Sequence, residues 1–274
     1  MSFIKIELKR SFCRWQGIFA FLLILAIFGY AYSCDYLYSK SDALMNLNIY
    51  NKYNAYNHFF RAIRGVSSRM FIMIAPLIMV LVCGDSLNID RHQKMLPLFL
   101  TRINYKKYIL KKIIALSIVG FVFIFSALLL SYVLASLIFP YTFPSQKGQG
   151  APWFFGNLCL TRPYLYLVMN LCIQGLIGAC FSIFALLVSV FVKSRFVGLF
   201  IPWLIYLITN VGMEIIQQGC YKPTVLAGEY LYYSYYIEHG MEWLVPLFWL
   251  TFWVLFSILT YICFKVSFNK GNLY

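Results

Sequence analysis

Apolar residues gather in six long stretches along the chain, separated by segments rich in polar and charged side chains. Each stretch is long enough to cross a hydrocarbon core of about 30 Å as an α-helix. The pattern therefore predicts an all-α, polytopic membrane protein with one membrane domain over residues 1–274. The six predicted spans cover about 17–37, 70–87, 113–139, 164–192, 196–212 and 243–264.

Shorter segments show an amphipathic pattern instead. Residues 2–15 and residues 90–102 each alternate apolar and basic positions at helical spacing, which predicts two helices along the membrane surface. The second would lie between spans two and three and restart at Pro97. Its repeating positions are Met95, Leu96, Phe99 and Leu100 on the apolar side, with Arg91, Lys94 and Arg102 between them.

Two further segments adjoin the predicted spans. Asn104 is placed to cap a helix that begins near Tyr105 and continues into span three, with Lys111 and Lys112 anchoring its start among lipid headgroups. Residues 57–70 place apolar residues at helical spacing with three arginines between them. The favoured interpretation of this segment is an interfacial helix that leads into span two, and a role in contacting substrate or lipid headgroups is the alternative.

Composition supports a membrane location. The chain is 62% hydrophobic and 20% aromatic, whereas soluble domains are about 45–50% apolar. Lys and Arg total 23 against nine Asp and Glu, and fifteen of the 23 fall on one side if both termini are cytoplasmic. Because basic residues concentrate in cytoplasmic loops, this orientation fits best, and the positive charge indicates membrane lipids rather than nucleic acid as a partner.

Motifs for catalysis and cofactor binding are missing from the sequence. It holds no HExxH or GxSxG motif, no Gly-rich phosphate-binding loop with a following Lys, and no CxxC pair. We therefore expect no catalytic residue, no metal and no cofactor on this chain, which is predicted not to be an enzyme.

Polar residues inside the spans are the remaining candidates. Asn170 and Gln174 lie one helical turn apart in span four, and Asn210 lies late in span five. Hydrogen bonding between helices is the favoured interpretation, and lining a translocation path is the alternative. The small-residue pairs Gly175/Ala179 and Gly178/Ser182 permit close helix packing.

The segment between spans two and three resembles a known family. "GDSLNIDRHQKMLPLFLTRINYKKYILKKIIAL", residues 84–116, is similar to the corresponding segment of type 2 ATP-binding-cassette (ABC-2 type) exporter permeases. There an acidic residue, a short amphipathic helix, a "TR"-like turn and a Tyr/Lys-rich start of span three follow in this order. The N-terminal amphipathic helix, six spans and the length agree. Asp90 replaces the usual glutamate, and Gln93-Lys94 replace a small Gly-containing turn.

The resemblance implies a mechanism. Such permeases pair as dimers with a second copy or a paralogue, and a separate ATPase subunit with ATP and Mg binds their cytoplasmic face. The helix between spans two and three, here Gln93 to Thr101, would act as the coupling helix in a groove of that ATPase. The implied coupling residues are Asp90, Arg91, Lys94, Met95, Leu96, Phe99, Leu100 and Arg102.

The expected function is export of a peptide, drug or lipid-like substrate across a bacterial cell membrane. Phe99 and Leu100 would then face the ATPase or lipid, and the sequence leaves both open. An ATP-independent channel or scaffold, and a membrane-embedded enzyme, are the alternatives.

Overall fold

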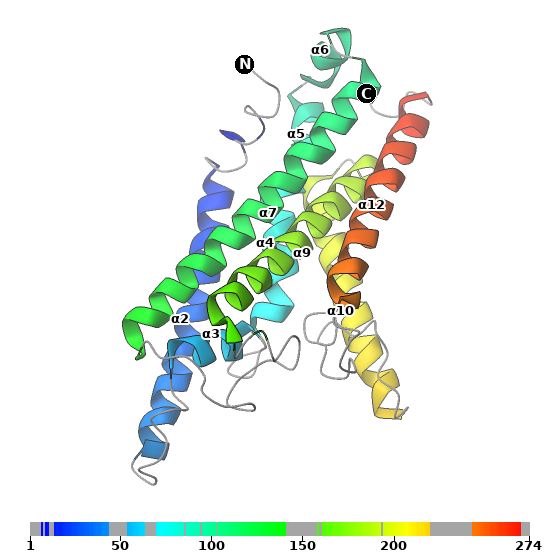
Figure 1. The fold of residues 1–274 in the computed structure, drawn as a ribbon. Coiled ribbons are helices and arrows are strands. Elements are labelled where there is room, and N and C mark those ends of the chain that lie inside the picture. The colour runs from blue at the N-terminus through cyan, green and yellow to red at the C-terminus, as the bar shows by residue number, and fades with distance from the viewer. Residues whose placement is uncertain are drawn as a thin grey trace.

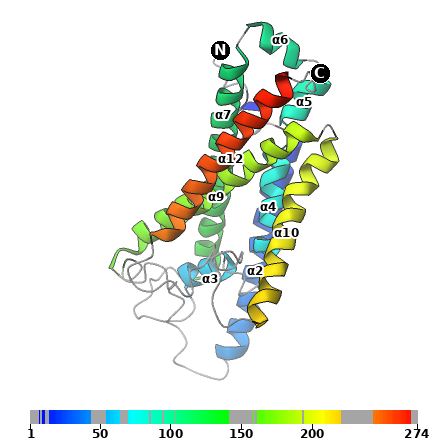
Figure 2. The ribbon, with the colours of Figure 1, turned by 90° about the vertical axis from the view of Figure 1, so that its right-hand side faces the viewer.

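The described part of the chain is nearly all helical, and its long helices run side by side (Figures 1 and 2). The computed structural model describes residues 7, 9–10, 14–43, 54–63, 70–84, 86–93, 95–102, 104–140, 158, 161–192, 194–219 and 243–269. The helices are α2 Trp15–Ala43, α3 Ala55–Ile63, α4 Met70–Cys83, α5 Ser86–His92, α6 Met95–Arg102, α7 Tyr105–Ile138, α9 Pro163–Phe191, α10 Arg195–Gly219 and α12 Leu244–Asn269.

Two helices form the centre of the bundle. Helix α9 packs against α4, α7, α10 and α12, and α4 packs against α2, α7, α9 and α10. Helices α5 and α6 lie at one end, which we call the α6 end, together with the end of α12 (Figure 1). Helix α3 lies toward the opposite end, which we call the α3 end.

The helical prediction is confirmed, and the span boundaries are partly revised. Five stretches of the described residues are long and apolar enough to cross a membrane, so the protein has the helices of a multi-pass membrane protein. The apolar part of α10, Val197–Thr209, is shorter, and the count of six spans stays a prediction. The five longer stretches are Trp15–Leu37, Met73–His92, Tyr105–Ile138, Pro163–Phe191 and Val245–Asn269.

Helices α7 and α9 cross with almost no space between their backbones. A Cβ atom added at Gly178 would lie 2.7 Å from the carbonyl oxygen of Gly120, and one added at Gly120 would lie 2.6 Å from that of Gly178. The hydroxyl of Ser182 donates to Gly178 O at 2.8 Å, so the polar side chain is satisfied within its own helix. The predicted close packing at Gly178 and Ser182 is thus confirmed, because small residues let two helices approach.

Segment 57–70, predicted as an interfacial helix, is buried in protein over the part that the structure describes. Helix α3 covers Ala55–Ile63, and Phe59 and Phe60 on it are fully buried. Their rings pack against Phe28 of α2 and Tyr166 of α9. The apolar face of α3 therefore meets protein rather than headgroups, and residues 64–69 lie outside the described chain.

Charged residues also attach α3 to its neighbours. The Nδ1 atom of His58 lies 2.9 Å from a carboxylate oxygen of Asp35 on α2, and both side chains are buried. Arg61 approaches the other oxygen of the same carboxylate at 3.6 Å. The His58 ring stacks on Phe139 at the end of α7, with 3.9 Å between ring centroids. These contacts explain why a helix with polar residues is buried among apolar ones.

Between α4 and α7 the chain forms two short helices rather than one that restarts at Pro97. Helix α4 ends with a turn at Gly84, where a Cβ would lie 2.7 Å from Val80 O. Helix α5 follows, and α6 begins at Met95, two residues before Pro97, where the ring fits because the first turn of a helix needs no N–H donor. The predicted cap at Asn104 is confirmed, since its side chain accepts from the Lys106 N–H at 3.2 Å.

Candidate functional site

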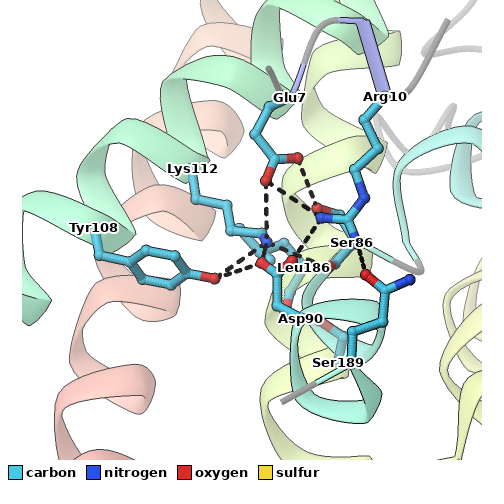
Figure 3. Close-up of polar contacts among 9 residues, drawn as sticks. Glu7, Arg10, Ser86, Asp90, Tyr108, Lys112, Leu186 and Ser189 are labelled. Carbon is cyan, nitrogen blue, oxygen red and sulfur yellow. Dashed lines mark hydrogen bonds and ion pairs between the residues drawn. The ribbon is translucent and has the colours of Figure 1, made fainter. Parts of the chain in front are cut away.

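A cluster of polar and ionisable side chains is gathered at the α6 end, where Figure 3 shows them pointing toward one another. It joins three parts of the chain that are far apart in sequence: the N-terminal segment, α5 and the first turns of α7. We call it the charge network, and its members are Glu7, Arg10, Ser86, Asp90, Tyr108 and Lys112.

Lys112 occupies the middle of the charge network and is 0% exposed. Its ammonium group forms an ion pair with the carboxylate of Asp90 and lies 3.6 Å from Glu7 Oε1. It also donates to the backbone carbonyl of Ser86 and to the hydroxyl of Tyr108, both at 3.2 Å. An ammonium group carries three donors, so the surroundings satisfy it without water.

Asp90 is equally buried and is bound from three sides. Besides Lys112, the guanidinium of Arg10 donates to Oδ1 at 2.6 Å and the hydroxyl of Tyr108 donates to Oδ2 at 2.7 Å. Glu7 accepts a hydrogen bond from the Ser86 hydroxyl at 3.1 Å. Two carboxylates thus face two cations, and this balance keeps such a buried group of charges tolerable, because an unpaired buried charge is very unfavourable.

Helical spacing places these side chains. Ser86 and Asp90 are four residues apart on α5, and Tyr108 and Lys112 are four residues apart on α7, so each pair lies on one face of its helix. Glu7 and Arg10 are three residues apart and contribute from the N-terminal segment. The two helix faces meet with their polar residues in register, and the N-terminal segment covers them from a third direction (Figure 3).

Arg91 extends the contacts of α5 to the end of α9. Its guanidinium donates to the backbone carbonyls of Ser189 at 2.6 Å and Val190 at 3.0 Å, and to the Asn88 side chain at 3.2 Å. The last carbonyls of a helix have no partner within the helix and carry partial negative charge. Arg91 therefore caps the C-terminal end of α9 from outside and joins α5 to the centre of the bundle.

Replacing Arg91 with lysine should lower the free energy of unfolding by about 1–3 kcal/mol, because a lysine keeps the charge but cannot bind two carbonyls in a fixed fork. The measurement is the temperature at which half of the detergent-purified protein is lost from the monodisperse peak in size-exclusion chromatography. Lys107→Arg, at an exposed position of α7, is the control and should leave that temperature unchanged. Equal temperatures for Arg91→Lys and wild type would contradict the capping role.

Aromatic rings connect the charge network to α6 and α12. Tyr108 is fully buried, and its ring lies 6.0 Å from that of Phe99 on α6 and 6.0 Å from that of Phe264 on α12. One turn earlier, Tyr105 stacks on Phe268 at 4.9 Å. Leu96 of α6 is 1% exposed. Helix α6 is thus fixed along its inner face to α7, while Met95 and Pro97 on it are exposed.

The described coupling residues of α5 and α6 divide into four that make contacts inside the protein and one that is exposed. Asp90, Arg91, Leu96 and Phe99 make internal contacts, whereas Met95 is 41% exposed. Phe99, for which the sequence left lipid and ATPase open, packs on Tyr108. Lys94 and the side chains of Leu100 and Arg102 lie outside the described residues.

The polar residues of span four are brought together as predicted. Asn170 and Gln174 are 6% and 1% exposed on one face of α9. Their side-chain carbonyl oxygens accept no hydrogen bond from the described residues, so the favoured hydrogen bonding between helices does not involve these two atoms. The translocation path stays a prediction, and the Asn210 side chain lies outside the described part.

Sequence reasoning missed most of the charge network. Lys112 was predicted to anchor span three among headgroups, and this is wrong because the side chain is fully buried. Tyr108, Glu7 and Arg10 were not singled out as site residues. The available signal was the (i, i+4) pair Tyr108/Lys112, whose lysine falls at the start of an apolar face shared with Tyr108 and Ile109.

No family model matches the chain, and no curated protein matches it. The likeness to exporter permeases therefore depends on the residues and the plan described above.

Proposed function

We propose that this chain is the membrane subunit of an ATP-binding-cassette exporter. In this proposal it crosses the cell membrane of a bacterium six times with both termini cytoplasmic, pairs with a second copy or a paralogue, and moves a peptide, drug or lipid-like substrate outward. ATP and Mg are held by a separate ATPase subunit. The α6 end is then the cytoplasmic end, and α6 is the coupling helix.

The observation that carries the proposal is the two-sided character of α6. Its inner face is fixed by Leu96 and by Phe99 against Tyr108, and its outer face presents Met95 and Pro97. An exposed methionine on a short helix at the end of a bundle suits a protein contact, because its flexible apolar side chain adapts to a partner's groove. The resemblance of residues 84–116 to exporter permeases supports the same assignment.

The contacts that Asp90 and Arg91 make explain how a movement of α6 would be transmitted to the spans. Asp90 joins α5 to α7 through Lys112 and to the N-terminal segment through Arg10. Arg91 joins α5 to the end of α9. Since separating buried opposite charges costs several kcal/mol in an environment without water, these elements move as one unit. A displacement of α6 is therefore transmitted to α7 and α9, which cross at Gly120 and Gly178.

The test is co-purification of an ATPase with the tagged chain from its native membranes. We expect a second polypeptide with a phosphate-binding loop to be retained, and the complex to hydrolyse ATP. Met95→Asp should reduce the retained ATPase by at least about tenfold, because a buried unpaired carboxylate costs more than 1.4 kcal/mol in an interface. Met95→Leu is the matched control and should retain the partner.

Met95 suits this test better than Arg91 or Phe99, because those two side chains make contacts inside the protein and their substitution would alter the fold as well. Folding of the Met95→Asp chain is checked by its size-exclusion profile. Full retention of the ATPase by a folded Met95→Asp chain would contradict the assignment of α6 as the coupling helix. Absence of any ATPase from the wild-type preparation, together with ATP-independent flux in liposomes, would contradict the proposed function.

A further inference from the structure

Helix α3 lies where an amphipathic helix has two positions open to it. It contacts α2, α7 and α9 at Asp35, Phe139 and Pro163, each within two residues of an end of an apolar stretch. At this level of a membrane an amphipathic helix can also lie among the lipid headgroups, with its apolar face toward the hydrocarbon. We call the position that α3 has in the structure the docked position and the alternative the interfacial position.

The apolar face of α3 does not decide between the two positions. Phe59, Phe60 and Ile63 are fully buried against protein in the docked position. In a bilayer, however, lipid tails are as apolar as leucine side chains, so burial against another helix brings no hydrophobic gain over burial in lipid. The polar contacts of α3 therefore determine where it lies.

Those polar contacts converge on one carboxylate. Asp35 of α2 lies 2.9 Å from His58 through one oxygen and 3.6 Å from Arg61 through the other, so both basic side chains of α3 meet it. Tyr56 adds a longer contact, with its hydroxyl 3.4 Å from the carbonyl oxygen of Pro163. Because a charged group in apolar surroundings needs a partner, Asp35 favours the docked position strongly.

The docked α3 covers the start of a row of polar side chains on α9. We call Tyr166, Asn170 and Gln174 the polar row, since they follow one another at intervals of about one helical turn on one face of α9. All three are buried, and the ring of Phe60 lies 5.3 Å from that of Tyr166. The side-chain oxygens of Asn170 and Gln174 accept no hydrogen bond from the described residues. These acceptors would bind water if it could reach them.

The polar groups around α3 are less well satisfied than those of the charge network. No side chain of the charge network has a buried nitrogen or oxygen without a hydrogen-bond partner. Near α3, the amide nitrogen of Asn54 and the Nε atom of Arg61 are buried and have no hydrogen-bond partner among the described residues. Each such atom makes the docked position less favourable, and water would satisfy it when α3 moves away. The docked position is thus the kind of arrangement that opens locally while the rest of the bundle stays folded.

We propose that α3 is a lid that moves between the docked and the interfacial position, and that Asp35 holds it in the docked one. When the lid leaves, Tyr166 is uncovered first, and water then reaches Asn170 and Gln174 deeper in the bundle. The inference goes beyond the proposed function and does not depend on it, because it concerns this chain alone and requires neither ATP nor a partner subunit.

Hydrogen–deuterium exchange tests whether α3 moves separately from the bundle. The full chain in lipid nanodiscs, without ATPase or ATP, is compared with Asp35→Asn by mass spectrometry. We expect the variant to raise amide exchange over residues 55–63 by at least about tenfold, because it removes the charge that both basic residues meet. Exchange in α7 and α9 around Gly120 and Gly178 should stay unchanged. No rise over α3, or an equal rise in all three helices, would overturn the proposal.

Two further variants are the controls for this measurement. Ser33→Ala lies two residues from Asp35 on α2, and the hydroxyl that it removes donates only to Gly29 O of the same helix. It should leave exchange over α3 as in wild type. Asp35→Glu keeps the carboxylate and should restore most of the slow exchange that Asp35→Asn loses. Fast exchange in Asp35→Glu equal to that in Asp35→Asn would show that the charge does not hold α3 and would overturn the role of Asp35.

Thiol labelling tests whether the lid covers the polar row. Gln174→Cys is treated with a charged maleimide that does not cross lipid, and labelling at each cysteine is measured by mass spectrometry. Adding Asp35→Asn should increase labelling at position 174 by at least about fivefold. Cys172, which is exposed on another side of α9, should show no change. Unchanged labelling at 174 despite faster exchange over α3 would overturn the lid. Either failure leaves the ATPase co-purification test unaffected, so the two proposals fail separately.

Discussion

Replacing Lys112 with methionine is expected to lower the free energy of unfolding by about 3–5 kcal/mol, the cost of removing one partner from a buried ion pair. Methionine keeps a side chain of similar length, so the change removes the charge rather than the packing. Asp90 and Glu7 would then share a single cation, Arg10, whose side chain is 21% exposed. The measurement is the half-loss temperature in size-exclusion chromatography after heating, together with the yield of folded protein.

The neighbouring lysine is the matched control. Lys111 is exposed on α7, and Lys111→Met should leave the half-loss temperature near that of wild type. A double variant, Asp90→Asn with Lys112→Met, removes one charge of each sign. It should be less destabilised than the sum of its two single changes, because each single change leaves an unpaired charge in the network. Equal effects of Lys111→Met and Lys112→Met would refute the buried charge network.

The second large effect is expected at the crossing of α7 and α9. Gly178→Leu should lower the free energy of unfolding by more than about 3 kcal/mol, beyond the usual range for overpacking. The new Cβ would lie 2.7 Å from the Gly120 carbonyl oxygen, and a backbone atom cannot rotate away as a side chain can. We therefore expect the two helices to separate and little monodisperse protein to be recovered from membranes.

Gly29 of α2 supplies the control for this change. A Cβ added there meets nothing within 4 Å, so Gly29→Leu should give a normal yield and half-loss temperature. Gly178→Ala should fall between wild type and Gly178→Leu, since it adds the clashing Cβ without the rest of the side chain. A normal yield of Gly178→Leu would show that the close crossing is not needed for folding.

The long helices could be predicted because run length and apolar content decide whether a segment crosses a membrane. Local chemistry also predicted where α7 begins, since the cap formed by Asn104 involves a neighbour two residues away. The position of α3 could not be predicted in the same way. Its amphipathic pattern shows that one face seeks an apolar environment, but lipid and protein both provide one. The protein environment is favoured by Asp35, which lies on another helix and pairs with His58.

The candidate site, like α3, could be predicted from local patterns only in part. The resemblance directed attention to Asp90 and α6, and the pattern placed Leu96 and Phe99 on one side of that helix. A lysine at the start of a span normally reaches headgroups, so Lys112 had an adequate local explanation. Its burial depends on Asp90 and Glu7, which lie 22 and 105 positions earlier in the chain. Contacts over such distances leave no periodic pattern in the sequence.

The charge network also has a consequence for how the protein is made. Glu7 and Arg10 emerge from the ribosome early, but Asp90, which binds Arg10, and Lys112, which pairs with Glu7, are synthesised 80 and 105 residues after them. Until α5 and the start of α7 have been made, Glu7 and Arg10 lack the partners that bury them in the folded protein. The contacts of Glu7 and Arg10 with α5 and α7 therefore form only after Lys112 has been synthesised. Those of Arg91 form later still, because the end of α9 that it caps is synthesised about a hundred residues after it.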